Sequence, residues 1–160
     1  MFLLDTDVVA ELRRGGQADA ALTGWAGGVA RERLFLSTVS LLDLEQAAAR
    51  LPPREKAQAE RLRRWIDEQV LSAFDGRILP LDGATVRRCR GLALPDPRDT
   101  LIAATALEQG LTLATRRTPA FKAAKVKLID PWKHAPEAAS DWRHADRGEP
   151  HWLKTLFVRA

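Results

Sequence analysis

The sequence has little cysteine and no long apolar run. Its single cysteine, Cys89, has no partner within the 160 residues, so neither an internal disulfide nor a cysteine-based zinc site can form. The longest apolar stretches, at 2–4 and 101–107, are far shorter than the roughly 18 residues that a membrane-spanning helix needs. The opening residues place an acid at Asp5 with no basic residue before it, so we expect no secretory leader. We therefore expect a cytoplasmic protein with no membrane span.

Acidic residues are absent between Gln109 and Ile129, a segment that holds five basic ones. The whole chain carries 25 Lys and Arg against 21 Asp and Glu, a net charge of +4. A segment with charge of one sign is typical either of an ordinary solvated surface or of a face that binds phosphate groups. With 46% hydrophobic residues the chain can build the core of one domain.

Short apolar runs alternate along the chain with helical patterns. Strands are predicted at 2–4, 34–36, 78–79, 111–113 and 126–129. Helices are predicted at about 8–14, 18–27, 38–51, 53–74, 85–92 and 99–109. This alternation favours an α/β fold with a parallel central sheet flanked by helices on both faces, because parallel neighbours need crossover connections. Ligands of such sheets bind beyond the carboxyl ends of the strands.

The pattern changes after Pro131 to a polar C-terminal extension. We therefore predict a single domain over 1–132 and an extension over 133–160. Histidines and tryptophans gather around and beyond this boundary, at Trp132, His134, Trp142, His144, His151 and Trp152. The extension is interpreted as laying aromatic side chains on the domain or on a partner, and a histidine metal site is the alternative.

Carboxylates stand where strands meet loops or where helices begin, at Asp5, Asp43, Asp96 and Asp99. Each has an ordinary explanation as a helix cap or a solvated residue. If Asp5, Asp43 and Asp99 converge at the carboxyl edge of the sheet, a cation must offset their repulsion, and hard oxygen ligands select Mg²⁺ or Mn²⁺. Such an ion polarises phosphoryl oxygens and activates water. Together with the basic segment, the acids point to phosphodiester chemistry.

Four stretches of the sequence together resemble a PIN domain, and within that family the VapC-type toxins. They are Leu3 to Arg14, Leu34 to Leu44, Asp99 to Arg116 and Val126 to Trp132, of which Asp99 to Arg116 is the most specific. The resemblance covers residues 1 to about 132. It implies a metal-dependent endoribonuclease in the cytoplasm, a homodimer that acts on RNA as the toxin of a type II toxin-antitoxin pair. It also implies a cognate antitoxin protein whose tail enters the active site.

By this resemblance the first three family acids fall on Asp5, Asp43 and Asp99, which we predict to be catalytic and to bind Mg²⁺ or Mn²⁺. Glu45 lies roughly 200° around the helix from Asp43 and faces away from the site. The fourth family acid is missing, because Ala120 stands in its position. Two other acids, Asp7 and Asp96, are candidates to restore the lost charge as further metal ligands.

Substrate contacts are predicted for Thr6, Thr115, Arg116 and Arg117. Arg117 replaces the asparagine of the family's Thr-Arg-Asn motif and adds a positive charge beside the acids. That charge should lower the affinity for a cation. We interpret Arg117 as a ligand of substrate phosphate, since a guanidinium suits bidentate binding.

Two other functions remain open from the sequence. An apolar strand that ends in Asp5-Thr6-Asp7 also looks like the nucleophile motif of haloacid dehalogenase-type phosphatases, in which the first acid attacks phosphorus. That family should also have an acid after a later strand, whereas Asp99 precedes a helix. The second alternative is a PIN-like binding or regulatory module that has lost turnover. The missing fourth acid favours it, and the three retained acids argue against it.

Overall fold

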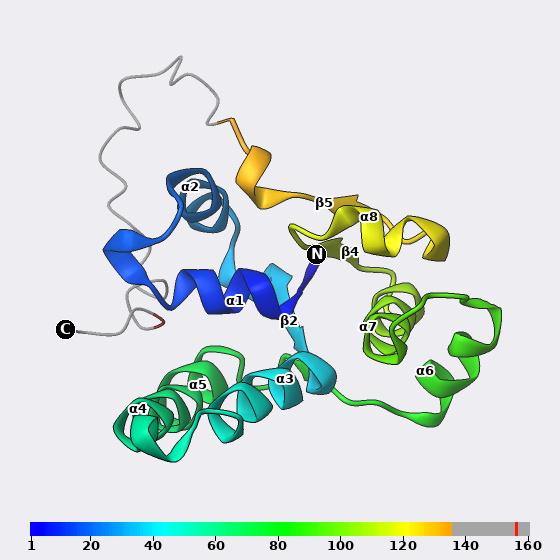
Figure 1. Ribbon diagram of the computed structural model, residues 1–160. Coiled ribbons are helices and arrows are strands. Elements are labelled where there is room, and N and C mark those ends of the chain that lie inside the picture. Colours follow the sequence, from blue (N-terminus) through cyan, green and yellow to red (C-terminus); the bar gives the residue numbers. More distant parts are fainter. Residues whose placement is uncertain (136–155, 157–160) are drawn as a thin grey trace, which may run out of the picture.

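The computed structural model describes residues 1–135 and Leu156, and its centre is a five-stranded sheet with all strands parallel (Figure 1). The strands are β1 (Phe2–Leu4), β2 (Leu34–Ser37), β3 (Ile78–Leu79), β4 (Thr112–Ala114) and β5 (Leu128–Ile129). Their spatial order is β3-β2-β1-β4-β5. The α/β class and the parallel sheet predicted from the alternation are thereby confirmed. The fourth strand begins one residue later than predicted, and the fifth keeps only two residues of the predicted four.

Helices connect the strands and cover both faces of the sheet. The α-helices are α1 (Thr6–Leu12), α2 (Ala20–Gly28), α3 (Thr38–Ala49), α4 (Lys56–Trp65), α5 (Leu71–Ala73), α6 (Gly83–Arg88), α7 (Pro97–Glu108) and α8 (Thr118–Phe121). Short 3₁₀ turns lie at Gly15–Gln17, Arg31–Arg33, Pro53–Glu55, Cys89–Gly91, Lys122–Ala124 and Pro131–Lys133. Within the described residues, none of these helices has the length and apolar character needed to cross a membrane.

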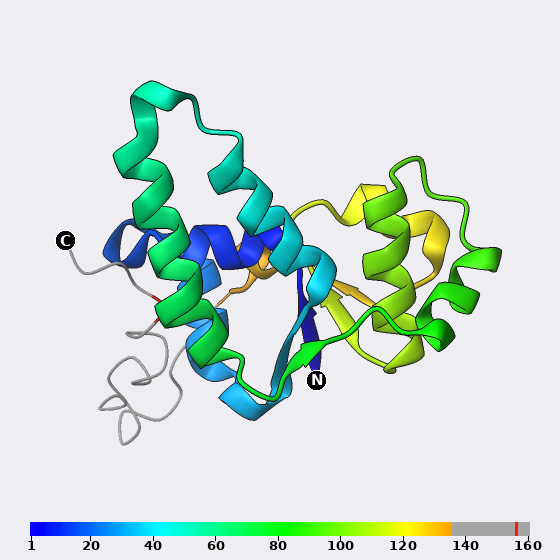
Figure 2. The same ribbon diagram turned by 90° about the horizontal axis from the view of Figure 1, so that it is seen from below.

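The long helix predicted over 53–74 is interrupted. A π-helical segment, Ile66–Val70, separates α4 from α5, and a 3₁₀ turn precedes α4. The segment keeps the helical path continuous, so α3 and α4–α5 form a hairpin that extends from the sheet (Figure 2). The periodicity of apolar residues therefore predicted the path but not the wider turn inside it.

Alternate residues of β1 face two separate hydrophobic clusters. Leu4 packs with Val8, Leu12 and other side chains of α1 to α5, whereas Leu3 packs with Ile102 of α7 and Phe121 of α8. Both leucines have no exposed surface. Because a parallel sheet is buried on both faces, its strands are apolar at every position, as β1 is. The predicted layers of helix, sheet and helix are confirmed.

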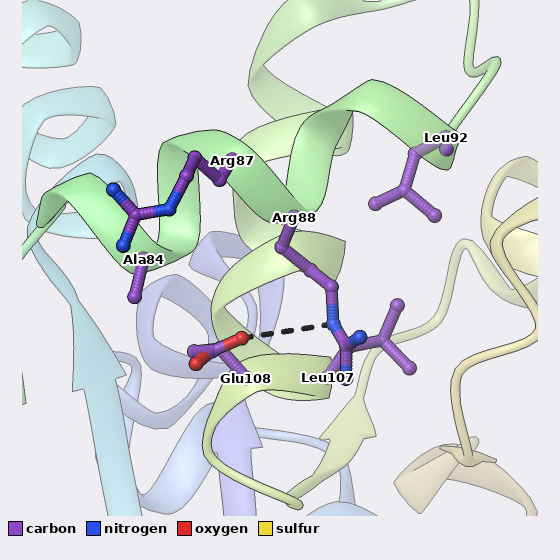
Figure 3. Close-up of a pocket in the computed structure, with 7 residues that line it drawn as sticks. Ala84, Arg87, Arg88, Leu92, Leu107 and Glu108 are labelled. Carbon is purple, nitrogen blue, oxygen red and sulfur yellow. Dashed lines mark ion pairs between the residues drawn. The ribbon is translucent and has the colours of Figure 1, made fainter.

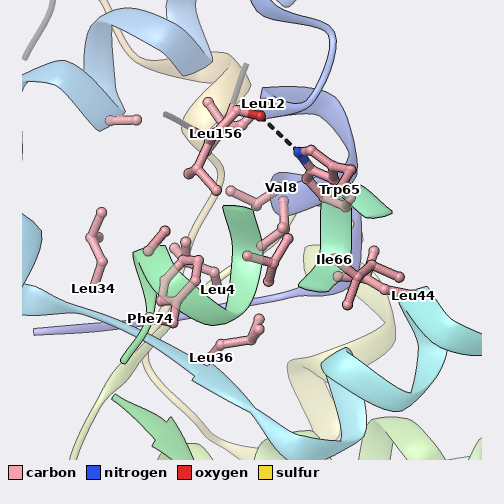
Figure 4. Close-up of a cluster of buried hydrophobic side chains, with 14 of the residues drawn as sticks. Leu4, Val8, Leu12, Leu34, Leu36, Leu44, Trp65, Ile66, Phe74 and Leu156 are labelled. Carbon is pink, nitrogen blue, oxygen red and sulfur yellow. Dashed lines mark hydrogen bonds between the residues drawn. The ribbon is translucent and has the colours of Figure 1, made fainter. Parts of the chain in front are cut away.

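One residue of the C-terminal extension belongs to the first cluster. Leu156 is fully buried near Leu12, and its carbonyl oxygen accepts a hydrogen bond of 2.8 Å from Nε1 of Trp65 (Figure 4). Trp132 also packs against this cluster. Four predicted features of the extension, Trp142, His144, His151 and Trp152, lie outside the described residues, and the domain boundary at 132 stays a prediction.

Candidate active site

The sheet reverses its direction of growth at β1. From β1 the chain first adds β2 and β3 on one side, and it later returns to place β4 on the other side. Asp5 follows β1 directly, and Thr115 follows β4. The backbone N–H of Asp5 donates to the carbonyl of Ala114 at 3.0 Å, which holds the two strand ends together. In open α/β sheets a crevice at such a reversal is the usual ligand site.

Two acids meet at this edge, and a guanidinium lies between them. Asp5 caps the N-terminus of α1, Asp99 lies in the first turn of α7, and both are buried, with 1% and 7% of their surfaces exposed. Nη2 of Arg117 donates to Oδ2 of Asp5 at 3.1 Å and to Oδ1 of Asp99 at 2.7 Å. Nη1 of Arg117 donates to Oδ2 of Asp99 at 3.1 Å. These contacts, above all those with Asp99, raise the pKa of Arg117 above its usual value.

Asp43 lies in the same pocket but pairs with a different arginine. It stands on α3, which begins at the end of β2, where the Ser37 hydroxyl caps the helix by accepting from the Ser40 N–H at 2.9 Å. Asp43 Oδ1 is 3.0 Å from Nη1 of Arg98, and Oδ2 accepts a hydrogen bond of 3.4 Å from the Thr6 hydroxyl. Burial raises the pKa of Asp43, and the charge of Arg98 opposes that rise.

Thr115 and Arg116 hold the two acids at the start of α1. The buried hydroxyl of Thr115 donates to Asp5 Oδ2 at 2.7 Å, and the backbone N–H of Arg116 donates to Asp7 Oδ2 at 2.9 Å. Burial, followed by the charge of Asp5, raises the pKa of Asp7 to about 6. Asp7 Oδ1 is buried and accepts no hydrogen bond within the described part of the chain.

The remaining predicted residues have local partners. Asp96 caps α7 by accepting a hydrogen bond of 2.8 Å from the backbone N–H of Arg98. Arg116 places its guanidinium over the ring of Trp132 at 5.5 Å. Ala120 lies on α8 and packs beside the second cluster. Thr115 and Arg117 both contact acids here, so their predicted contacts with substrate stay predictions.

Arg98 is a site residue that the sequence reasoning missed. The reason is that α7 begins at Pro97 and not at the predicted Asp99, which brings Arg98 into the first turn beside Asp99. The signal was present, because Asp at the cap followed by Pro at the first helical position is a common helix start. With this start, the first turn of α7 presents both a cation and a carboxylate to the pocket.

The pocket has a volume of about 390 Å³ and mixes carboxylates with arginines. Its lining consists of Asp5, Thr6, Asp7, Ala10, Asp43, Arg50, Asp96, Arg98, Asp99 and Arg117. Among residues 1–135 and Leu156, no three acidic, histidine or cysteine side chains are arranged to hold a metal ion. The donors nevertheless fit a hard divalent cation, since Asp5 and Asp99 direct carboxylate oxygens at one point, where Nη2 of Arg117 lies.

A larger cavity of about 640 Å³ lies between α6 and α7, near the end of α7 opposite Asp99 (Figure 3). Arg87, Arg88 and Glu108 line it, and Arg88 Nε is 3.7 Å from Glu108 Oε2. This cavity has a single carboxylate in its lining. The acids that can bind a cation therefore lie in the smaller pocket.

Similar proteins match most of the chain. Residues 2–126 match the family described as PIN domain. The chain is 34% identical to the toxin FitB of Neisseria gonorrhoeae, over 82% of this chain and 99% of that protein. It is 32% identical to the VapC ribonuclease Y4jK of Sinorhizobium fredii, over 84% of this chain and 100% of that protein. The crystal structure of FitAcB from Neisseria gonorrhoeae superposes with a TM-score of 0.73 at 32% identity, covering 83% of this chain and 99% of that chain.

Proposed function

The chain belongs to the PIN-domain family, and from that membership we propose that it is a divalent-metal-dependent endoribonuclease that acts as the toxin of a toxin-antitoxin pair. The observation that carries the proposal is the convergence of Asp5 and Asp99 on one point at the switch of the sheet. The similarity to a VapC ribonuclease and to a toxin supports the activity and its biological role.

We assign the binding of Mg²⁺ or Mn²⁺ to Asp5 and Asp99, with Asp43 as the third acid. When bound there, such a cation would polarise a phosphoryl oxygen and lower the pKa of a water molecule that attacks phosphorus. Asp7 and Asp96 support the site in different ways. Asp7 adds charge beside Asp5, whereas the Asp96 carboxylate is engaged in capping α7.

The other residues of the pocket orient the acids and the substrate. The Thr115 hydroxyl fixes Asp5 Oδ2, and the Thr6 hydroxyl contacts Asp43. Below a pH of about 6, Asp7 holds a proton, and Oδ1, which accepts no hydrogen bond from the described residues, is the atom that can carry it. Arg116 is exposed, and its guanidinium can bind a phosphate of the RNA backbone.

The proposed partners follow from the proposed activity. They are an RNA substrate, a cognate antitoxin protein and a second copy of the chain, all met in the cytoplasm. An antitoxin is required because an endoribonuclease toxin would otherwise damage the cell that makes it. Light scattering of the purified protein would measure the mass of the dimer.

The direct test is cleavage of a mixed cellular RNA pool by the purified protein in Mn²⁺. We expect cleavage that disappears in Asp5→Asn and on addition of EDTA, because each removes part of the cation site. The matched control is Asp67→Asn, since Asp67 is an exposed acid on the π-helical segment. It should cleave like the unsubstituted protein.

Other outcomes would support the alternatives. RNA binding without cleavage in saturating Mn²⁺ would establish a binding module, which the missing fourth acid at Ala120 favours. Hydrolysis of small phosphate esters that persists in Asp99→Asn would indicate a phosphatase. The toxin role has its own test: induced expression without antitoxin should arrest bacterial growth, Asp99→Asn should relieve the arrest, and Asp67→Asn should not.

A further inference from the structure

Arg117 places a positive charge at the point where the two buried acids converge. We propose that this guanidinium is a displaceable internal counter-ion, which occupies the position of the divalent cation and must leave Asp5 and Asp99 before the metal binds. The inference rests on the proposed function, which gives these acids a cation to hold.

The contacts of Arg117 resemble those of a bridging cation. A single nitrogen, Nη2, contacts oxygens of both acids, at 3.1 Å for Asp5 and 2.7 Å for Asp99. Nη1 adds a second contact to Asp99 at 3.1 Å, which completes a bidentate pair. Two carboxylates that are almost fully buried would repel each other without this charge. A metal ion and the guanidinium therefore compete for the same oxygens.

Several features allow the guanidinium to leave. The Arg117 side chain is 46% exposed, so solvent can receive it. The guanidinium carbon also lies 5.3 Å from the centre of the Phe121 ring. Phe121 packs in the second cluster, on the same side of the sheet as α7. Asp5 keeps hydrogen bonds from the Thr115 hydroxyl and the Thr6 backbone N–H. Asp5 therefore stays oriented for metal binding after the guanidinium has left both acids, which is the open state.

In the closed state Arg117 contacts both acids. This state reduces the apparent affinity for metal, because the metal can bind only to the fraction of molecules in the open state. Charge-assisted hydrogen bonds are strong, but exposure to water weakens this pair. We expect the closed state to lower the affinity for Mn²⁺ about tenfold, which corresponds to about 1.4 kcal/mol.

The experiment measures binding of Mn²⁺ to the metal-free protein in the absence of RNA, by electron paramagnetic resonance of the free ion. Arg117→Gln should bind Mn²⁺ about tenfold more tightly than the unsubstituted protein. The charge-matched control is Arg90→Gln, because Arg90 is exposed and lies beyond α6, away from the acid pocket. Its dissociation constant should stay within about twofold.

Thermal unfolding provides a second readout, because the substitution that tightens Mn²⁺ binding should lower the stability of the metal-free protein. In EDTA, Arg117→Gln should melt at a lower temperature than the unsubstituted protein, because the two buried carboxylates lose their counter-ion. Saturating Mn²⁺ should raise its melting temperature by more than it raises that of the unsubstituted protein. A purely structural arginine would lower the melting temperature equally with and without metal.

Unchanged or weaker Mn²⁺ binding by folded Arg117→Gln would overturn the proposal. If that variant does not fold, Arg117→Lys provides the test, because the lysine ammonium keeps the positive charge but cannot form the bidentate contact that the guanidinium makes with Asp99. We expect Arg117→Lys to bind Mn²⁺ more tightly than the unsubstituted protein, and equal binding would overturn the proposal. Tighter Mn²⁺ binding by Arg117→Gln, together with no RNA cleavage by the unsubstituted protein, would refute the proposed activity and leave the counter-ion role standing. If neither the unsubstituted protein nor any Arg117 variant binds Mn²⁺, the counter-ion proposal and the proposed metal-dependent activity are both refuted.

Discussion

Replacing Asp7 by asparagine should stabilise the protein at neutral pH and leave its stability nearly unchanged in acid. Burial and the neighbouring charge of Asp5 raise the pKa of Asp7 from 3.8 to about 6. The folded state therefore binds the Asp7 proton more tightly than the unfolded chain does, and ionisation of this carboxyl opposes folding. Asparagine keeps an acceptor for the Arg116 N–H and removes the charge.

The magnitude follows from the shift in pKa. One unit of pKa corresponds to about 1.36 kcal/mol, and the shift of Asp7 gives about 3 kcal/mol. Because the side chain is partly exposed, solvent screening reduces this to about 2 kcal/mol. Asp7→Asn should gain this amount above pH 6. The gain should shrink as the pH falls towards 3.8 and nearly vanish below it, where the carboxyl is protonated in both states.

The assay is urea unfolding of both proteins in EDTA at several pH values between about 3.5 and about 8, a range that includes the unfolded-state and folded-state pKa values of Asp7. Asp67→Asn is the control for removal of an exposed negative charge. A loss of stability on Asp7→Asn at neutral pH would refute the reasoning. So would a gain that does not change with pH, since only the ionised carboxyl carries the penalty.

Three further substitutions test separate parts of the structure. Thr115→Val should cost about 1–2 kcal/mol in urea unfolding, because the isosteric side chain removes the hydroxyl that donates to Asp5 Oδ2 at 2.7 Å; no loss would mean that the hydroxyl does not orient this acid. Asp96→Ala should cost about 1 kcal/mol by removing the cap of α7, as thermal unfolding followed by circular dichroism would measure. Leu156→Ala should cost about 3 kcal/mol and change the fluorescence of Trp65, and an unchanged spectrum would contradict the packing in Figure 4.

The sequence predicted that Asp5 and Asp99 lie at one edge of the sheet, because their positions follow from local rules, whereas Asp43, predicted to converge with them, pairs with Arg98. Asp5 comes directly after a strand and Asp99 stands at the start of a buried helix, and parallel strands bring such ends to one edge. It did not predict the partner of Arg117. That partner depends on the direction of a long side chain, which is set by the packing of α8 and by the charges of two distant elements.

The start of α7 shows a second kind of limit. Counting apolar residues placed the start at Asp99, and the cap at Asp96 moved it to Pro97. This small displacement decided whether Arg98 was seen as part of the pocket. Similarly, Leu156 stands in a segment predicted as a polar extension, and only the tertiary structure brings it to Trp65.

The position of β1 at the middle of the sheet has a consequence for biosynthesis. The first strand of this domain to be synthesised needs two neighbours, and one of them, β4, is made only near the end of the domain. Strands this short do not form a stable pair by themselves. A nascent chain therefore holds Asp5 without Asp99 or Arg117 for most of its synthesis, and the acid pocket assembles only in the late steps of folding. The order of translation thus delays the appearance of a competent site until nearly the whole domain has been made.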